Sequence, residues 1–160
     1  KIDYIRDRIN IIVRMNRTEI YDGVRGLLAD ALGVESEDVV EGASLYKDLG
    51  AESIDDLDII FRIDKRFGLH TQKKDLFPDV NLTYLIGNNG SNSSRVSEEG
   101  IADLRARAPH VNFDGLGRRP ILRNVEGRIK SVGTIVNYLE GRLSGNSQDS
   151  RHERALDYSI

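Results

Sequence analysis

The 160-residue sequence has no cysteine and no tryptophan, and aromatic residues make up only 6% of it. Without cysteine the chain can form no disulfide bond, no thiolate zinc site and no thiol nucleophile. No apolar run approaches the roughly 20 residues that cross a bilayer, and no basic-then-apolar signal peptide opens the chain. We therefore expect a cytoplasmic protein without a membrane span, built as one domain or as one domain with an appendage.

Charge is distributed unevenly along the chain. The net charge is only −3, yet residues 18–68 contain 13 acidic and five basic residues. Nucleic acids are bound mainly through Lys and Arg contacts to phosphates, so this block argues against a nucleic-acid partner. It favours attraction to a basic protein surface or to divalent cations. A solvated helical face would show the same density of acids, and the charge pattern leaves both interpretations open.

Two segments before residue 70 show clear helical periodicity. Thr18 is placed to cap the first helix, and Gly33 is placed to end it. Ser53 is expected to open the second helix as its N-cap, in the pattern Ser-x-x-acid, and Gly68 to end it. The expected buried residues are Ile20, Val24, Leu27, Leu28 and Ala31 in the first helix, Leu57, Ile60, Ile63 and Phe67 in the second, and Val39, Leu45 and Leu49 between them.

The pattern loosens between about residues 70 and 127. Within this part we expect one capped helix, Glu98–Ala108, after a mobile loop at about residues 87–95. A last helix is expected from Val132 to Leu143, with Ser131 as its cap. Its expected buried face is Val132, Ile135, Val136, Leu139 and Leu143. The expected division is an N-terminal extension with apolar spacing compatible with a short helix (residues 1–17), a domain (residues 18–144), and a polar, disordered tail (residues 145–160).

Ser53 has a structural and a chemical interpretation. Serine is a favoured N-cap that contributes about 1 kcal/mol to a helix. A hydroxyl at a helix N-terminus is also open to solvent, and the free N–H groups and positive dipole end favour an attached phosphate. A hydrolase built on Ser53 lacks a credible base, because His70, His110 and His152 are scattered without triad spacing. No stretch has the ligand spacing of a calcium loop, and we expect no metal site.

The stretch "VRGLLADALGVESEDVVEGASLYKDLGAESIDDLDIIFRIDKRFG" resembles acyl carrier proteins. The resemblance lies in the first helix ending in Leu-Gly-Val, the acidic "ESEDV", the "LYKDLGAES" approach and the Phe-Gly stop. The family's Asp-Ser-Leu signature reads Glu52-Ser53-Ile54 here, and "IKSVGTIVNYLEGRL" is similar to the family's last helix. Residues 70–127 would then be an insertion of roughly 55 residues, and we expect its flanks to pack on the bundle beside the mouth of an acyl pocket.

The resemblance implies an all-α helix bundle that acts as a carrier and not as an enzyme. It implies that Ser53 bears 4′-phosphopantetheine through a phosphodiester, with acyl intermediates held on it as thioesters. The implied partners of this monomer are a phosphopantetheinyl transferase and fatty-acid or polyketide-type enzymes such as ketosynthases and acyltransferases. The alternative is an unmodified carrier-like module that acts only as a docking subunit. The implied docking residues are Glu52, Ile54, Asp55, Asp56, Asp58, Phe61 and Asp64.

Overall fold

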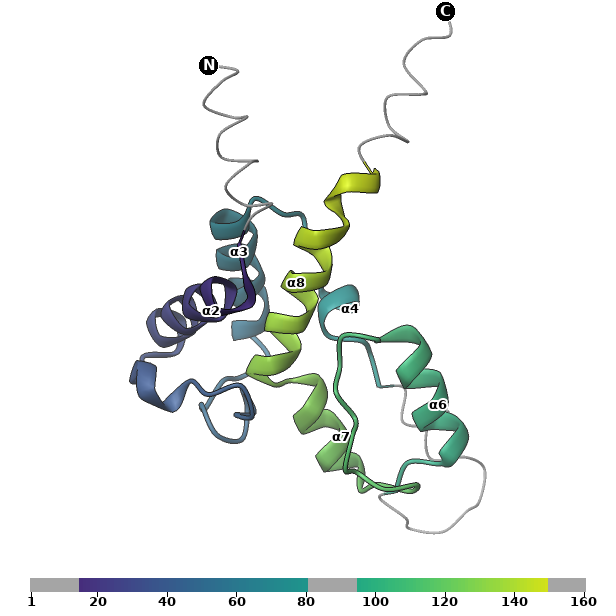
Figure 1. Ribbon diagram of the computed structural model, residues 1–160. Helices are drawn as coiled ribbons and strands as arrows, with labels where there is room; N and C mark the ends of the chain where they lie inside the picture. Colours follow the sequence, from purple (N-terminus) through teal and green to yellow (C-terminus); the bar gives the residue numbers. More distant parts are fainter. Residues whose placement is uncertain (1–14, 81–94, 150–160) are drawn as a thin grey trace, which may run out of the picture.

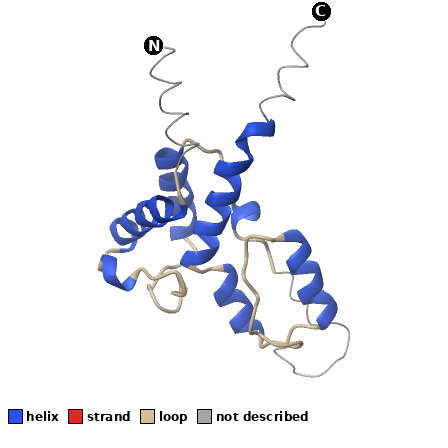
Figure 2. Cartoon of the chain, in the orientation of Figure 1, coloured by secondary structure: helices blue, strands red, loops and turns tan. Residues whose placement is uncertain are grey.

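The computed structural model describes residues 15–80 and 95–149, and the regular elements within these residues are helices, as predicted. Figures 1 and 2 show helices joined by loops, with no strand in the described part. None of the described helices combines the length and apolar character that a bilayer crossing requires. The helices are α2 (Arg17–Leu32), α3 (Asp55–Phe67), α4 (Lys73–Leu76), α6 (Glu98–Arg107), α7 (Leu122–Ile129) and α8 (Val132–Asp149), with a 3₁₀ turn, η1, at Ser36–Asp38.

Local sequence accounts for both ends of α2. The side chain of Asn16 accepts a hydrogen bond from the backbone N–H of Glu19 (3.0 Å), and the Glu19 carboxylate accepts one from the N–H of Asn16 (2.8 Å). This reciprocal capping box satisfies two amides at the helix start. The prediction of Thr18 as the cap is therefore wrong by two positions. Gly33 ends the helix at φ 65°, a left-handed conformation that glycine adopts without strain.

α3 begins at Asp55, and Ser53 and Ile54 form the turn before it. The predicted N-cap role of Ser53 is wrong, because its hydroxyl caps no amide of the helix. The Asp55 carboxylate instead accepts a hydrogen bond from the backbone N–H of Glu52 at 2.7 Å. This bond connects the incoming loop to the first turn of α3. Gly68 ends the helix in the left-handed conformation, as predicted.

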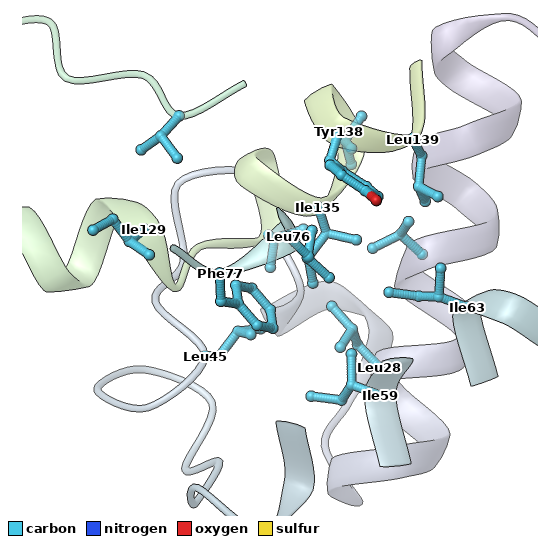
Figure 3. Close-up of a cluster of buried hydrophobic side chains, with 14 of the residues drawn as sticks. Leu28, Leu45, Ile59, Ile63, Leu76, Phe77, Ile129, Ile135, Tyr138 and Leu139 are labelled. Atoms are coloured by element: carbon cyan, nitrogen blue, oxygen red, sulfur yellow. The ribbon is translucent and has the colours of Figure 1, made fainter. Parts of the chain in front are cut away.

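One apolar core receives side chains from every described α-helix, and Figure 3 shows part of it. The predicted buried faces of α2 and α8 and the predicted loop anchors are confirmed, with Ala31 only half-buried. α3 departs from the prediction at one position. Leu57 is 66% exposed, and Ile59 is fully buried in its place. The buried face of α3 passes through Asp56, and hydrophobic periodicity cannot identify a buried carboxylate.

Two helices that were not predicted, α4 and α7, pack on the bundle. α4 and the residue after it place Leu76 and Phe77 in the core, and α7 buries Val125 and Ile129. Helices of this length contain too few turns for their periodicity to be recognised. The flanks of the segment predicted as an insertion therefore pack on the bundle, as expected.

α6 follows its prediction closely. The Ser97 hydroxyl accepts a hydrogen bond from the N–H of Gly100 at 3.0 Å, and Ile101 and Leu104 are buried. In Figure 1 α6 lies apart from α2 and α3. After α6, His110 donates a hydrogen bond from Nε2 to the carbonyl oxygen of Leu76 at 2.9 Å, which links this part to α4.

α8 begins as predicted but ends later. The N–H of Thr134 donates to the Ser131 hydroxyl at 3.2 Å, which confirms Ser131 as a cap. The helix continues to Asp149, so the first residues of the predicted tail are helical. The helix predicted within residues 1–17 falls mainly on residues 1–14, and the predicted mobile loop falls mainly on residues 81–94. The rest of the predicted tail is residues 150–160. All three ranges lie outside the described residues. Arg95, the last residue of that loop, pairs with Ile121 in an isolated bridge.

Candidate functional site

Ser53 lies at the end of a loop that is anchored on the core. Leu49 and Ala51 are buried, and the N–H of Ala51 donates to the carbonyl oxygen of Leu45 at 2.8 Å. Gly50, with φ 70°, makes the turn between the two anchors. Ser53 itself is exposed. The hydroxyl is thus held at a defined place and remains accessible to another enzyme.

A cavity of about 660 Å³ opens beside Ser53. Its lining comes from the loop at Tyr46, from Asp56 of α3, from Lys73 and the residues just after α4, and from α7 together with Lys130. The residues after α4 include Phe77, which is buried. The expectation that a flank of residues 70–127 lies beside a pocket near Ser53 is therefore met.

Asp56 lines this cavity and is only 1% exposed. Its Oδ2 atom accepts from the ammonium groups of Lys130 at 2.6 Å and Lys73 at 2.9 Å. The Tyr46 hydroxyl donates to Oδ1 at 2.9 Å. Lys130 also lies over the Phe77 ring, with its ammonium 4.0 Å from the ring centroid. A buried carboxylate is stable only when it is paired and hydrogen-bonded in this way.

The network shifts the pKa values of Asp56, Lys130 and Tyr46. Burial would raise the pKa of Asp56, but hydrogen bonds from Lys130 and Lys73 outweigh it and hold the pKa below its ordinary value. Burial lowers the pKa of Lys130, and the interaction with Asp56 offsets only part of this effect. Burial and the bond to Asp56 raise the pKa of Tyr46 to about 12. The tyrosine therefore stays a hydrogen-bond donor at neutral pH.

The first half of α3 exposes a row of apolar side chains. Ile54 is 76% exposed, Leu57 66% and Phe61 64%. Their spacing of three and four residues puts them on one side of the helix. Sequence reasoning identified Ile54 and Phe61 but placed Leu57 in the core. The signal that could have placed Leu57 on the exposed side is its spacing, three residues after Ile54 and four before Phe61.

The predicted docking acids do not all lie on this surface. Glu52 and Asp58 are exposed and Asp55 is half-buried. Asp56 must be removed from the predicted docking set, because its carboxylate is buried in the network with the two lysines. The Asp64 carboxylate is half-buried and accepts a hydrogen bond from the N–H of Thr71 at 3.0 Å, so it also serves the fold.

The site contains a hydroxyl without an obvious catalytic base. No histidine lines the described walls of the cavity. His110 packs against the Tyr138 ring at a centroid distance of 5.3 Å, and burial lowers its pKa. Within residues 15–80 and 95–149, no three His, Asp or Glu side chains are grouped as metal ligands would be.

Comparison with known proteins points to the same part of the chain. Residues 22–82 match the family described as "Phosphopantetheine attachment site". This range includes Ser53, all of α3 and α4, and most of α2. No solved structure gives a significant match to the chain.

Several curated relatives match this part of the chain, each named "Acyl carrier protein". The protein from Thermosynechococcus vestitus is 40% identical over 55 residues, which cover 34% of this chain and 68% of the relative. The protein from Thermotoga maritima is 36% identical over 61 residues, or 38% of this chain and 75% of the relative. One from Rhodopseudomonas palustris is 41% identical over 51 residues, or 32% and 65% of the two chains.

Proposed function

Because the chain belongs to the acyl carrier protein family, we propose that Ser53 is the attachment site of 4′-phosphopantetheine and that the protein carries acyl intermediates on this arm. The observation that carries the proposal is the position of Ser53. It is an exposed hydroxyl at the start of α3, on the rim of a cavity, within the region that matches the attachment-site family. The proposed pathway is of the fatty-acid or polyketide type.

The residues around Ser53 fit this group. The Ser53 oxygen would bond to the phosphorus of a phosphopantetheine donor held by the modifying enzyme. The donor's bond from that phosphorus to its nucleotide phosphate would break, the nucleotide would leave, and the serine proton would pass to the enzyme, so the chain itself needs no base. The first turn of α3 presents backbone N–H groups and the positive end of the helix dipole toward a phosphate. When attached, the group supplies the thiol on which an acyl chain is held as a thioester. The role of the chain is therefore to place Ser53 and to present the arm.

We propose that partner enzymes dock on the exposed apolar row of α3, Ile54, Leu57 and Phe61. Apolar side chains at the centre of a contact, ringed by charged groups, are the usual arrangement of a protein interface. Glu52, Asp55 and Asp58 supply the surrounding negative charge, which would attract basic partners. The partners in this proposal are a phosphopantetheinyl transferase and acyl-processing enzymes such as ketosynthases and acyltransferases.

The attachment is tested by intact-mass measurement after co-expression with a broad-range phosphopantetheinyl transferase. The wild-type protein should gain one phosphopantetheine mass, and Ser53→Ala should gain none. Ser44→Ala, which changes another serine of the same cavity, should still be modified. Because Ser53 caps no amide of α3, its replacement should change the free energy of unfolding by no more than about 0.5 kcal/mol. An unmodified wild-type protein would favour the alternative of a docking subunit without a prosthetic group.

The docking surface is tested with two exposed apolar residues. Leu57→Ser should raise the apparent KM of the transferase for the carrier about five- to tenfold, the effect of losing one interface contact of about 1–1.4 kcal/mol. Val40 is 51% exposed but lies outside α3, so Val40→Ser should leave KM unchanged. Equal KM values for the two variants would contradict docking on this surface.

A further inference from the structure

The cavity beside Ser53 has a charged side and an apolar side. Four cationic side chains and three carboxylates line it, so its lining carries one uncompensated positive charge. Phe77, Pro78 and Ile129 contribute apolar walls. Ligand pockets commonly combine such walls with a few placed polar groups. The cavity therefore suits a ligand in which an anion is directly followed by an aliphatic group.

The uncompensated charge is concentrated at Asp56, where two ammonium groups share one carboxylate oxygen. The Lys130 side chain is 18% exposed and makes the shorter contact, 2.6 Å. The Lys73 side chain is 45% exposed and lies 2.9 Å from the same oxygen. Lys73 is thus the ammonium group that a second anion can approach while Lys130 keeps Asp56 neutralised.

The position of Ser53 would bring an anion to Lys73. Ser53 precedes Asp56 by three residues, and Ile54 between them has helical backbone angles. Residues at this spacing have Cβ atoms about 5–6 Å apart on one side of a helix. A phosphate on Ser53 would also lie near Glu52 and Asp55, whose charges repel it. Lys73, which contacts Asp56 and is partly exposed, is a cation of the cavity that can offset this repulsion.

We propose that in the modified protein the root of the arm rests in this cavity. Its phosphodiester contacts the Lys73 ammonium, and the two methyl groups that follow the phosphate in 4′-phosphopantetheine pack against Phe77. The inference rests on the proposed function, since it requires the arm on Ser53. Lys73 and Phe77 both belong to the segment after α3. The task of this segment is then to hold the start of the arm against the protein, so that the arm does not extend freely from Ser53.

The test compares apo and modified protein for the wild type, Lys73→Gln, Lys73→Arg and the matched control Lys74→Gln, which removes an exposed charge from the next residue of α4. Intact mass first establishes modification at Ser53. The thermal midpoint of each pair then isolates the effect of the arm from any effect of the substitution on the apo protein. Modification should raise the midpoint by about 2–4 °C in the wild type, in Lys74→Gln and in Lys73→Arg, and the rise should be lost in Lys73→Gln.

A second measurement keeps the inference testable even if Lys73→Gln folds poorly. In the modified wild type, NMR should show nuclear Overhauser contacts between the methyl groups of the arm and the Phe77 ring, and a phosphorus resonance that moves as salt weakens the contact with Lys73. Complete modification with equal midpoints in apo and modified protein, and no such contacts, would overturn the inference while leaving the proposed function intact. Absence of any mass gain would instead refute the proposed function on which the inference depends.

Discussion

At the scale of single residues, the Asp56 carboxylate connects α3 to α4 and to the junction between α7 and α8, through Lys73 and Lys130. Removing one partner of a buried ion pair leaves an uncompensated charge and costs about 3–5 kcal/mol. Asp56→Asn should therefore lower the free energy of unfolding by about this amount in urea titrations. Asp58→Asn is the matched control, because its exposed pair with Arg62 contributes only about 0.3–0.5 kcal/mol. Similar losses in the two variants would contradict the role of Asp56.

The same residue predicts how stability depends on pH. The folded-state pKa of Asp56 lies below its ordinary value of 3.8, so the folded protein binds this proton less readily than the unfolded chain. The stabilising contribution of Asp56 should then be complete above about pH 4 and be lost as the pH falls through the folded-state pKa. On acidification the wild type should lose more stability than Asp56→Asn, and urea titrations between pH 5 and pH 3 measure the difference.

At the scale of elements, the start of α8 is held against the loop before Ser44. The N–H of Gly133 donates to the carbonyl oxygen of Glu41 at 2.8 Å, and a Cβ at position 133 would lie 3.0 Å from that oxygen. The neighbouring N–H of Val132 donates to the carbonyl oxygen of Ala43 at 3.0 Å. The loop that leads to Ser53 is thus connected to the last helix by backbone hydrogen bonds, and the close approach at position 133 leaves no room for a side chain.

Two glycines of α8 should respond in opposite directions to the same substitution. Gly133→Ala should destabilise the protein by about 1–3 kcal/mol, the usual cost of overpacking. Gly141 lies in the same helix, and a Cβ added there would meet no atom within 4 Å. Gly141→Ala should stabilise the protein by up to about 1 kcal/mol, because alanine favours a helix interior. Thermal unfolding of both variants measures whether each substitution raises or lowers stability, and a gain of stability in both would contradict the close approach at Gly133.

At the scale of the whole molecule, the described chain contains a bundle of α2, α3, α4 and α8 and a more loosely connected part around α6. α2 packs against α3 and α8, and α4 also contacts α3 and α8, whereas contacts of α6 with the other described helices are sparse at most. Figure 1 shows this arrangement, with α6 at one side of the molecule. Elements with few contacts to the rest open at a lower free-energy cost than the core. The part around α6 should therefore be able to open while the site at Ser53 stays folded.

Hydrogen exchange with two leucine variants tests this division. Leu104 of α6 and Leu28 of α2 are both fully buried, and truncating a buried leucine costs about 2–5 kcal/mol. Leu104→Ala should accelerate exchange of the α6 amides while those of α3 stay protected and Ser53 is still modified. Leu28→Ala should accelerate exchange throughout the bundle. Equal acceleration of α3 in the two variants would show that the chain opens as one unit.

The position of Ser53 just before α3, the ends of α2 and α3 at their glycines, and the buried faces of α2 and α8 could all be read from the sequence. Each depends on residues within a few positions of one another: a short motif, a glycine that adopts a left-handed conformation, or a spacing of three and four residues. The error at Thr18 was two residues, because several polar side chains near a helix start compete for the same amides, whereas the start of α3 is capped by no side chain.

The burial of Asp56, the exposure of Leu57 and the cavity beside Ser53 could not be read in this way. They depend on contacts between distant parts of the chain, such as the bond between Lys130 and Asp56, which are 74 residues apart. An aspartate is buried in preference to the leucine beside it only when such a cation lies against the aspartate's side of the helix. Local sequence specifies which segments become helices and where a hydroxyl is offered. Which side of each helix is covered, and what chemistry surrounds that hydroxyl, follows from the energy of packing and ion pairing among segments that meet only in the folded protein.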